Sequence, residues 1–208
     1  GKAVTVPTQD MILGSYYLTV DKPGEPGEGK VFRDEDEARM AYDNGVIGLH
    51  APIRVRRTME INGEMKSHLV DTTIGRVIFN TSIPQDLGFM DRTMHEGETV
   101  YSASYLDRAL GYEIDFKVGK KQLGDIIWRC YQTCGQKKTV ETLDALKSLG
   151  YKEATRSGCS IGIVDMVVPE NKDGVISNAY DEVAKVTEQY EEGLITNGER
   201  YEKVINIW

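Results

Sequence analysis

The sequence has only three cysteines and three histidines among 208 residues, and no apolar stretch reaches the ~20 residues of a membrane-spanning helix. The odd number of cysteines, with Cys130 near Cys134 and Cys159 far from both, does not form a disulfide framework. The N-terminus lacks the basic segment and short apolar stretch of a secretory signal. These absences predict a soluble chain that works in the cytoplasm, with reduced thiols and no membrane partner.

An excess of basic charge is also absent, because 33 acidic residues outweigh 25 basic ones and leave a net charge of −8. Affinity for nucleic acid comes chiefly from lysine and arginine, so this balance argues against an independent nucleic-acid binder. The charge is uneven: residues 117–138 contain six basic residues and one acid, whereas residues 170–192 contain seven acids and two lysines. The basic region suits an anionic ligand, although solvated surfaces of opposite sign explain the same pattern.

Hydrophobic periodicity and turn residues predict an α+β fold. Apolar residues at helical spacing, framed by capping residues or glycines, predict helices at residues 35–44, 122–134, 139–149 and 172–208. Apolar or alternating runs predict strands at residues 3–6, 52–70, 151–156 and 161–168, and residues 74–83 are a further β-branched run. Residues 11–20 suit an apolar helix or a strand. Residues 21–30 and 85–116 predict a loop and an irregular, acidic excursion.

Two local signals are especially clear. Asn62-Gly63 is the dipeptide of a type I′ turn, so residues 52–70 predict a β-hairpin. The C-terminal apolar positions recur at spacings of three and four, the pattern of a coiled-coil seam: Ile176, Ala179, Val183, Val186, Tyr190, Tyr201, Val204 and Trp208. Because only a short turn at Gly193 separates the two periodic segments, we expect an antiparallel helical hairpin after a mixed body of short strands and helices.

Two motif matches resemble catalytic sites but lack essential partners. Residues 24–30 (GEPGEGK) match half of a phosphate-binding P-loop, yet Val31 stands where a hydroxyl should bind Mg²⁺, and two glutamates would face the phosphates. Residues 158–162 (GCSIG) match the nucleophile elbow of a serine hydrolase, but all three histidines precede Ser160, against the order of that fold. We interpret the two segments as a flexible loop and a tight turn.

The cysteines and histidines do not have the spacing of a metal site. Cys130 and Cys134 lie one helical turn apart, but a structural zinc site needs four ligands and no second pair is nearby. The histidines, His50, His68 and His95, share no spacing. We therefore predict no metal and no cofactor in this chain.

Five ordered blocks are more specific than these motifs. They are PTQDMILGSYYLT (7–19), DTTIGR (71–76), GKK with LGDII after it (119–127), ATRSGCSIGIVDMVVPE (154–170) and GLITNGERYEKVINIW (193–208). Together they closely resemble the largest catalytic subunit, β′, of bacterial DNA-directed RNA polymerase. The resemblance runs across essentially the whole chain. It implies a pore domain over residues 1–168 and the start of the funnel domain, with a truncated rim-helix hairpin, over residues 169–208.

The resemblance implies a place in the secondary channel of this nucleotidyltransferase. Nucleoside triphosphates would enter there, a backtracked RNA 3′ end would leave, and Gre-type cleavage factors would dock at the rim. The other polymerase subunits (β, α, ω and σ) would be partners, in nucleoid-associated cytoplasm. The family's catalytic motif, NADFDGD, whose aspartates hold Mg²⁺, would lie before Gly1 and is absent here. We therefore expect a piece of a longer protein that is inactive alone.

Four channel residues follow from the resemblance. Gln9 in PTQD matches the pore glutamine that faces the active centre, where an amide can both donate and accept hydrogen bonds. Lys120 and Lys121 match the family's GKK, and Arg156 matches the arginine of its A-x-R-S-G turn. These basic residues would line a channel that passes polyanions; exposed charges without a ligand are the alternative.

Three docking residues at the hairpin follow in the same way. Glu199 resembles the rim-helix acid associated with cleavage-factor docking, with Arg200 beside it, and Lys203 resembles a basic position one turn later. An acidic tip suits a partner with a basic face.

A second hypothesis is a stand-alone protein–protein interaction module built on the acidic hairpin. An excised polymerase segment would expose apolar faces and self-associate or be marginally stable, whereas an independent module would be monomeric and unfold cooperatively. A serine hydrolase built on Ser160 is a third hypothesis, which a fluorophosphonate label tests.

Overall fold

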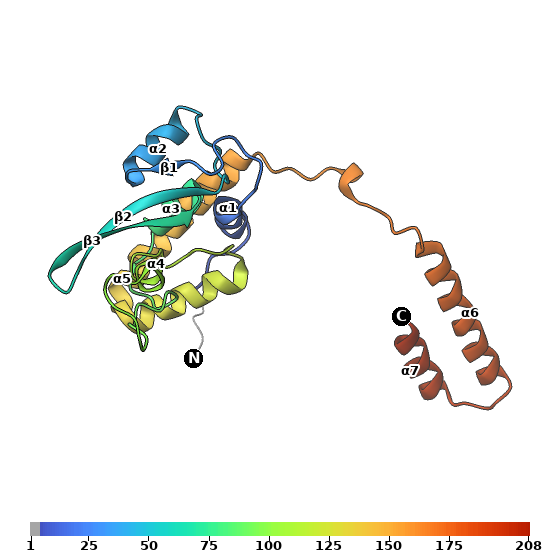
Figure 1. Cartoon of the computed structure of the whole chain (residues 1–208). Coiled ribbons are helices and arrows are strands. Elements are labelled where there is room, and N and C mark those ends of the chain that lie inside the picture. The colour runs from blue at the N-terminus through green and yellow to red at the C-terminus, as the bar shows by residue number, and fades with distance from the viewer. Residues whose placement is uncertain (1–4) are drawn as a thin grey trace. The chain divides into compact units, whose positions relative to one another are not determined.

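The computed structural model describes residues 5–208, which divide into two compact units, one ending at Cys159 and the other running from Ser160 to Trp208. The elements of the first unit are α1 (Asp10–Thr19), β1 (Val31–Phe32), α2 (Glu35–Asp43), β2 (Ile53–Ile61), β3 (Glu64–Thr72), α3 (Ile74–Asn80), α4 (Ala103–Ala109) and α5 (Lys120–Ser157) (Figure 1). The second unit holds a 3₁₀ turn, η1 (Ile163–Asp165), and the helices α6 (Lys172–Glu191) and α7 (Asn197–Ile207). The fold is α+β, as predicted.

The sheet has the order β1-β2-β3, with β1 parallel to β2 and β3 antiparallel to it. Asn62 and Gly63 join β2 to β3 with φ of 53° and 82°, the positive values that a type I′ turn requires. Side chains alternate along the first part of β2, where Ile53 and Val55 are buried and Arg54 is exposed. The predicted hairpin is therefore confirmed. The predicted strand at residues 3–6 falls partly outside the described residues, and residues 5–6 are not in a strand.

α1 is a helix because it packs against α5 at close range. A Cβ atom on Gly14 would lie 1.9 Å from the carbonyl oxygen of Gly150, and one on Gly150 would lie 2.7 Å from Cα of Met11. Only glycine allows two helix backbones to approach this closely. Ser15, Leu18 and Thr19 are also buried, and residues 11–20, which suited either a helix or a strand, are helical as far as Thr19.

The capping residues explain α2 and α3. The side chain of Asp34 accepts a hydrogen bond of 2.8 Å from the backbone N–H of Glu37, which confirms the predicted helix start. Thr73 caps α3 in the same way, with a hydrogen bond of 3.2 Å from Arg76. The β-branched run that begins at Ile74 is therefore helical as far as Asn80, because the cap and burial override its strand-like composition.

The excursion over residues 85–116 is ordered around a buried carboxylate. Glu113 is 1% exposed, accepts a hydrogen bond of 2.8 Å from the backbone N–H of Phe89 and forms an ion pair with Arg92. The guanidinium of Arg129, on α5, lies 4.2 Å from the centre of the Phe89 ring. The prediction of a wholly irregular segment is wrong in one respect, since α4 is helical.

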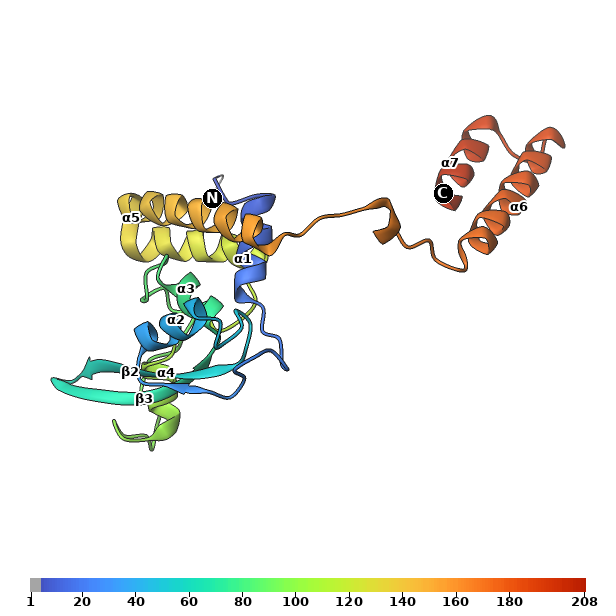
Figure 2. The same cartoon turned by 90° about the horizontal axis from the view of Figure 1, so that it is seen from above.

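α5 consists of two helical segments that meet at Gly135, whose φ of 77° and ψ of 179° are not helical. The chain reverses there, so that the two segments lie side by side (Figure 2) and the Cys130 thiol contacts the Thr142 hydroxyl at 3.6 Å. Both predicted helices are confirmed. The predicted strand at residues 151–156 is wrong, because the helix continues to its left-handed cap at Gly158.

The predicted strand at residues 161–168 is also wrong. None of these residues pairs with a strand among the described residues, and η1 is the one regular turn in the segment. Its apolar side chains are exposed; Ile163 and Val164 are each 92% exposed. A β-branched composition is not sufficient for a strand that has no partner to hydrogen-bond.

The predicted helical hairpin is confirmed in α6 and α7. The chain turns at Gly193, with φ of 77°, and the rings of Tyr180 and Trp208 meet edge to face with their centres 5.4 Å apart. Neither helix has a fully buried residue.

The division into pore and funnel domains at residue 168 stays a prediction. None of the described helices has the length and hydropathy to cross a membrane.

Candidate functional site

α1 contacts α5 at two places, one next to the start of α5 and one in its second helical segment. The backbone N–H of Val118, two residues before α5 begins, donates a hydrogen bond of 2.9 Å to the hydroxyl of Thr19. The second segment of α5 meets α1 at the Gly14–Gly150 crossing. Because the two segments are antiparallel, the start of α5 and its end lie on the same side of the first unit, with α1 beside them (Figures 1 and 2). Lys120 and Lys121, at the start of α5, and Arg156, near its end, therefore lie on the same side of the first unit, with α1 between them.

Lys120 and Lys121 are exposed first-turn residues of α5. Neither ammonium group pairs with a carboxylate of residues 5–208. The helix macrodipole places partial positive charge at a helix N-terminus, where cations are unfavourable and anions are stabilised. The two lysines therefore do not stabilise α5, and together with the helix end they create a positively charged surface that suits an anion.

Arg156 is held at the end of α5 by a buried acid. Its guanidinium lies 3.4 Å from Oε1 of Glu153 and 5.9 Å from the centre of the Tyr42 ring. Glu153 is 1% exposed, and its other oxygen has no hydrogen-bond partner among residues 5–208. Burial, followed by the nearby Tyr42, raises the pKa of the adjacent Tyr17, so Tyr17 stays a neutral phenol.

Gln9 caps α1 in an unusual backbone conformation, with φ of 49° and ψ of −122°. Its carbonyl oxygen accepts hydrogen bonds from the N–H groups of Ile12 (2.9 Å) and Leu13 (3.1 Å), while its side chain is exposed. It lies at the opposite end of the helix from Thr19, about 15 Å away at 1.5 Å per residue. Gln9 therefore lies away from the start of α5, and its role stays a prediction.

Sequence analysis did not single out Thr19, Arg76 or Glu153 as individual residues. Thr19 and Arg76 lie inside the quoted blocks PTQDMILGSYYLT and DTTIGR, and they meet in space, where Nε of Arg76 donates a hydrogen bond of 3.0 Å to the carbonyl oxygen of Thr19. Their place in two of the five blocks was the sequence signal that could have identified them. Glu153 gives no such signal, because nothing in the sequence distinguishes it from an exposed helical glutamate.

In the hairpin unit, Glu199 closes a capping box at the start of α7. Its carboxylate accepts hydrogen bonds from the backbone N–H (2.8 Å) and the hydroxyl (2.9 Å) of Thr196, whose hydroxyl oxygen in turn accepts one from the N–H of Glu199 (3.3 Å). The N–H of Thr196 holds the pKa of Glu199 below its usual value. The carboxylate predicted to dock a factor therefore also shapes the hairpin tip.

Arg200 and Lys203 also make contacts within the hairpin. Arg200 donates hydrogen bonds to the side-chain oxygen of Asn197 (3.2 and 2.8 Å) and lies over the ring of Tyr190, 5.2 Å from its centre. Nζ of Lys203 donates a hydrogen bond of 3.1 Å to Gln189 on α6. The docking role of all three residues stays a prediction; the contacts of Arg200 and Lys203 join α7 to α6, and those of Glu199 cap α7.

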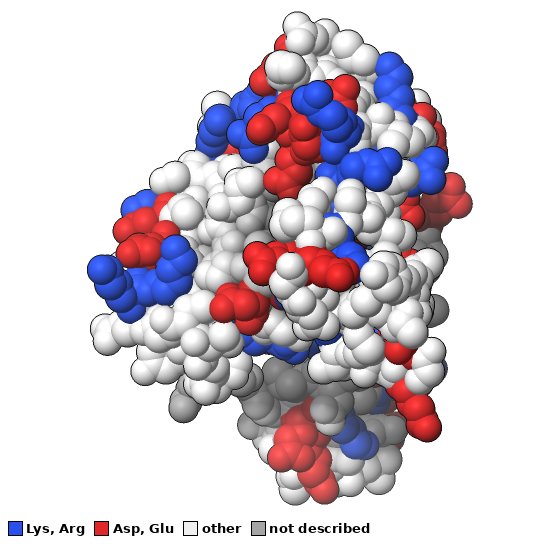
Figure 3. All heavy atoms as spheres, turned by 60° about the vertical axis from the view of Figure 1, so that its left-hand side comes forward, with Lys and Arg blue, Asp and Glu red and all other residues white. Residues whose placement is uncertain are grey.

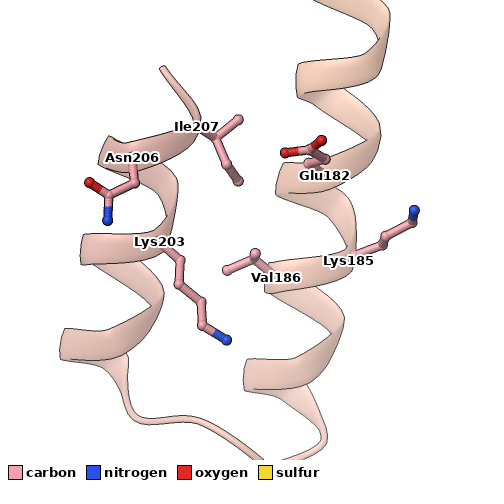
Figure 4. A pocket seen from close by; sticks show the side chains of 6 residues that line it. All are labelled: Glu182, Lys185, Val186, Lys203, Asn206 and Ile207. Carbon is pink, nitrogen blue, oxygen red and sulfur yellow. The ribbon is translucent and has the colours of Figure 1, made fainter.

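A shallow groove of about 340 Å³ lies between α6 and α7. Figure 4 shows Val186 and Ile207 pointing into the gap between the helices and Lys203 reaching along it. The lining residues are Glu182, Lys185, Val186, Lys203, Asn206 and Ile207.

The other sequence motifs do not assemble a site. In the P-loop-like segment, the N–H of Gly24 donates a hydrogen bond of 2.7 Å to Glu28, so the loop's own carboxylate takes an amide that phosphate would need. The second unit, which holds Ser160, contains no histidine. Within residues 5–208 no three metal-ligating side chains come together. Lysine, arginine and acidic side chains lie in small mixed groups on the face in Figure 3.

The three histidines contact three different groups. His50 approaches the carbonyl oxygen of Val20 (3.1 Å), His68 pairs with Asp107 (2.7 Å), and the third, at position 95, pairs with Asp91 (3.0 Å). Cys130 is buried, and Cys159 is exposed at the end of the first unit.

Comparison with known proteins agrees with the resemblance that the five blocks carry. The family model for RNA polymerase Rpb1, domain 3, matches residues 1–166. This chain belongs to that family. It is 50% identical over all 208 residues to DNA-directed RNA polymerase subunit β′ of Caldicellulosiruptor saccharolyticus, 49% to that of Caldanaerobacter subterraneus and 50% to that of Clostridium acetobutylicum. It spans 17% of the length of each of these relatives.

Proposed function

We propose that this chain forms part of the secondary channel of a bacterial RNA polymerase, as a segment of its β′ subunit. The observation that carries the proposal is that three basic residues, Lys120, Lys121 and Arg156, lie on the same side of the first unit, at the two ends of α5 that flank α1. Nucleoside triphosphates entering the channel, and a backtracked RNA 3′ end leaving it, are polyanions. A positively charged surface raises their local concentration and their rate of arrival.

The chain contributes binding and positioning, and the catalytic metal is held elsewhere in the polymerase. The motif NADFDGD does not occur in the sequence, and residues 5–208 offer no group of three metal-ligating side chains. In the complete polymerase Mg²⁺ supplies charge stabilisation for nucleotidyl transfer. We expect the purified chain to make no RNA, and primer extension by the chain alone would contradict this.

An exchange of segments tests the channel role. These 208 residues replace the corresponding part of β′ in the Clostridium acetobutylicum polymerase, and the reconstituted enzyme is assayed with and without K120A/K121A. An interaction that stabilises the bound substrate and the transition state equally affects KM and not kcat. We therefore expect K120A/K121A to raise the KM for nucleoside triphosphates several-fold with little change in kcat. The control is K147A, an exposed lysine of α5. Equal KM values for the double variant and the control would contradict the channel role.

We further propose that Gre-type cleavage factors dock at the hairpin of α6 and α7, and that the β, α, ω and σ subunits complete the assembly in nucleoid-associated cytoplasm. Charge and capping at Glu199 are separable. E199Q removes the charge but keeps an acceptor oxygen, whereas T196A removes the cap and keeps the charge. Factor-stimulated RNA cleavage should fall in E199Q and persist in T196A. The reverse pattern would show that the tip's shape, and not its charge, matters.

A stand-alone interaction module remains the second candidate, because the hairpin belongs to a compact unit of its own. The two candidates differ in self-association. An excised polymerase segment exposes apolar residues such as Val164 and Val167 and should self-associate, whereas a module should sediment as a monomer. Sedimentation of the purified chain over a range of concentrations distinguishes them.

A further inference from the structure

Thr19 is the buried connection between α1 and the segment that leads into α5. Its side chain is 0% exposed, and its hydroxyl donates a hydrogen bond of 2.8 Å to the carbonyl oxygen of Ser15 and accepts the one of 2.9 Å from the N–H of Val118. Val118 is itself fully buried. The side-chain oxygen thus satisfies a buried backbone donor that is 99 residues away along the chain.

The position of Thr19 is fixed independently of this bond. Its carbonyl oxygen accepts the hydrogen bond from Arg76, whose guanidinium also pairs with Asp21 at 2.9 Å. The neighbouring carbonyl of Leu18 packs so closely on α3 that a Cβ atom on Gly75 would lie 2.0 Å from its oxygen. The Thr19 hydroxyl is therefore a fixed point to which the start of α5 is attached.

The attachment lies two residues from Lys120. Between them, the N–H of Gly119 donates a hydrogen bond of 3.2 Å to Oε1 of Gln122, so the first turn of α5 is held by one bond to α1 and one to its own side chain. Two lysines in the first turn of a helix interact unfavourably with the helix dipole. Buried Leu123 holds the first turn of α5 against the core, and the Thr19–Val118 bond fixes the backbone that leads into it.

We propose that Thr19 is a positioning residue, whose hydroxyl fixes the start of α5 and thereby holds Lys120 and Lys121 where they meet an anionic ligand. The inference rests on the proposed function of the two lysines and adds the residue through which the fold aims them. Thr19 itself is buried and touches no ligand.

The alternative is that Thr19 only fills space in the core. Valine has the same shape as threonine without the hydroxyl, and serine keeps the hydroxyl without the methyl group. T19V therefore preserves packing and removes the bond, whereas T19S preserves the bond and loosens packing. A space-filling role predicts more damage in T19S, and a positioning role predicts more in T19V.

The test uses the complete 208-residue chain with inorganic tripolyphosphate as the probe. Binding is followed by the backbone amide NMR shifts of Lys120 and Lys121, and hydrogen exchange of the Val118 amide is measured without ligand. We expect T19V to weaken tripolyphosphate binding about fivefold and to speed Val118 exchange, since that donor loses its partner, with T19S close to the parent chain. K120A/K121A should abolish binding and leave Val118 exchange unchanged.

Each result that differs from these expectations has a defined meaning. If T19V binds tripolyphosphate like the parent chain, or if T19S loses as much affinity as T19V, the positioning role is overturned. If K120A/K121A binds as well as the parent, the lysines are not the anion site and the proposed function fails. In that case the shifts and exchange rates at residues 118–121 still decide whether the Thr19 hydroxyl fixes the start of α5.

Discussion

Gln9 and Asn62 are the two described non-glycine residues with positive φ, and the conformation has a different origin in each. Asn62 lies in a type I′ turn, which favours asparagine. Gln9 combines φ of 49° with ψ of −122°, outside the left-handed helical region, and its exposed side chain offers no compensating hydrogen bond to residues 5–208. Backbone strain of this kind costs about 1–3 kcal/mol and is concentrated at functional positions.

We expect Q9G to stabilise the chain by about 1 kcal/mol, because glycine adopts this conformation freely and the relief exceeds its entropic cost. Q9A is the matched control, since it removes the same amide and keeps the strain. Urea unfolding of the two variants measures the difference. If Q9G is no more stable than Q9A, the backbone at Gln9 is not strained.

Glu113 is the buried charge that organises the excursion. E113Q leaves Arg92 without its ion-pair partner in a largely buried place, which should destabilise the chain by about 3 kcal/mol. R92M/E113Q should recover part of that loss, because it removes both charges. A double-mutant cycle by urea unfolding tests this, and additive effects of the two substitutions would contradict the ion pair's role.

The crossing of α1 and α5 depends on glycines for a reason that a matched pair of variants can isolate. G14A places a Cβ atom 1.9 Å from a backbone oxygen, which no side-chain movement relieves, and should cost about 3 kcal/mol or prevent folding. G124A, within α5, meets nothing within 4 Å and should stabilise the helix by about 0.5–1 kcal/mol. Thermal unfolding compares them, and similar effects would show that the crossing is not tight.

The capping box of α7 makes the hairpin tip sensitive to acid. The pKa of Glu199 is lowered in the folded chain, so its contribution to stability is present above the unfolded pKa and is lost as pH falls through the folded one. The amide NMR shift of Thr196 should follow this titration at a pKa below the usual glutamate value. T196A removes the hydroxyl donor and keeps the backbone N–H, so in T196A the pKa of Glu199 should move only part of the way back toward that value. An unchanged titration in T196A would contradict the capping role.

Local signals predicted elements well where the deciding residues are neighbours in sequence. Asp34, Asn62-Gly63 and Gly193 each determine a cap or turn through their own backbone, and the structure confirms all three. Residues 151–156 were predicted as a strand and are helical, because packing of Gly150 on α1 extends α5. Residues 161–168 have the composition of a strand but do not form one, because composition alone cannot provide a second strand to pair with.

The candidate site was predictable only in part, for the same reason. The lysines and Arg156 follow from the resemblance, but their position on the same side of the first unit depends on the chain reversal at Gly135, and the Thr19–Val118 bond joins residues far apart in sequence. Glu153 gains its importance solely from burial. Such features are set by tertiary packing, which no short pattern records.

The net negative charge is concentrated in the second unit, because residues 160–208 hold ten acidic and four basic residues, whereas acidic and basic residues are nearly balanced in residues 1–159. Lys120, Lys121 and Arg156 lie in the first unit, and the acids of α6 lie in the second. Under the proposed function, the first unit would contact polyanions and the acidic hairpin would present the docking surface. Because the chain divides into two units, substitutions in each unit test its proposed role independently.

The most direct test is a photo-crosslinking experiment in a backtracked elongation complex, built with β′ carrying these 208 residues. A photoreactive amino acid replaces Lys120 or Arg156 in turn, and Lys147 in the control, with the RNA labelled at its 3′ end. We predict RNA adducts from positions 120 and 156 and none from position 147. Equal labelling at all three positions, or labelling only from the control in a polymerase that still transcribes, would contradict a place in the channel.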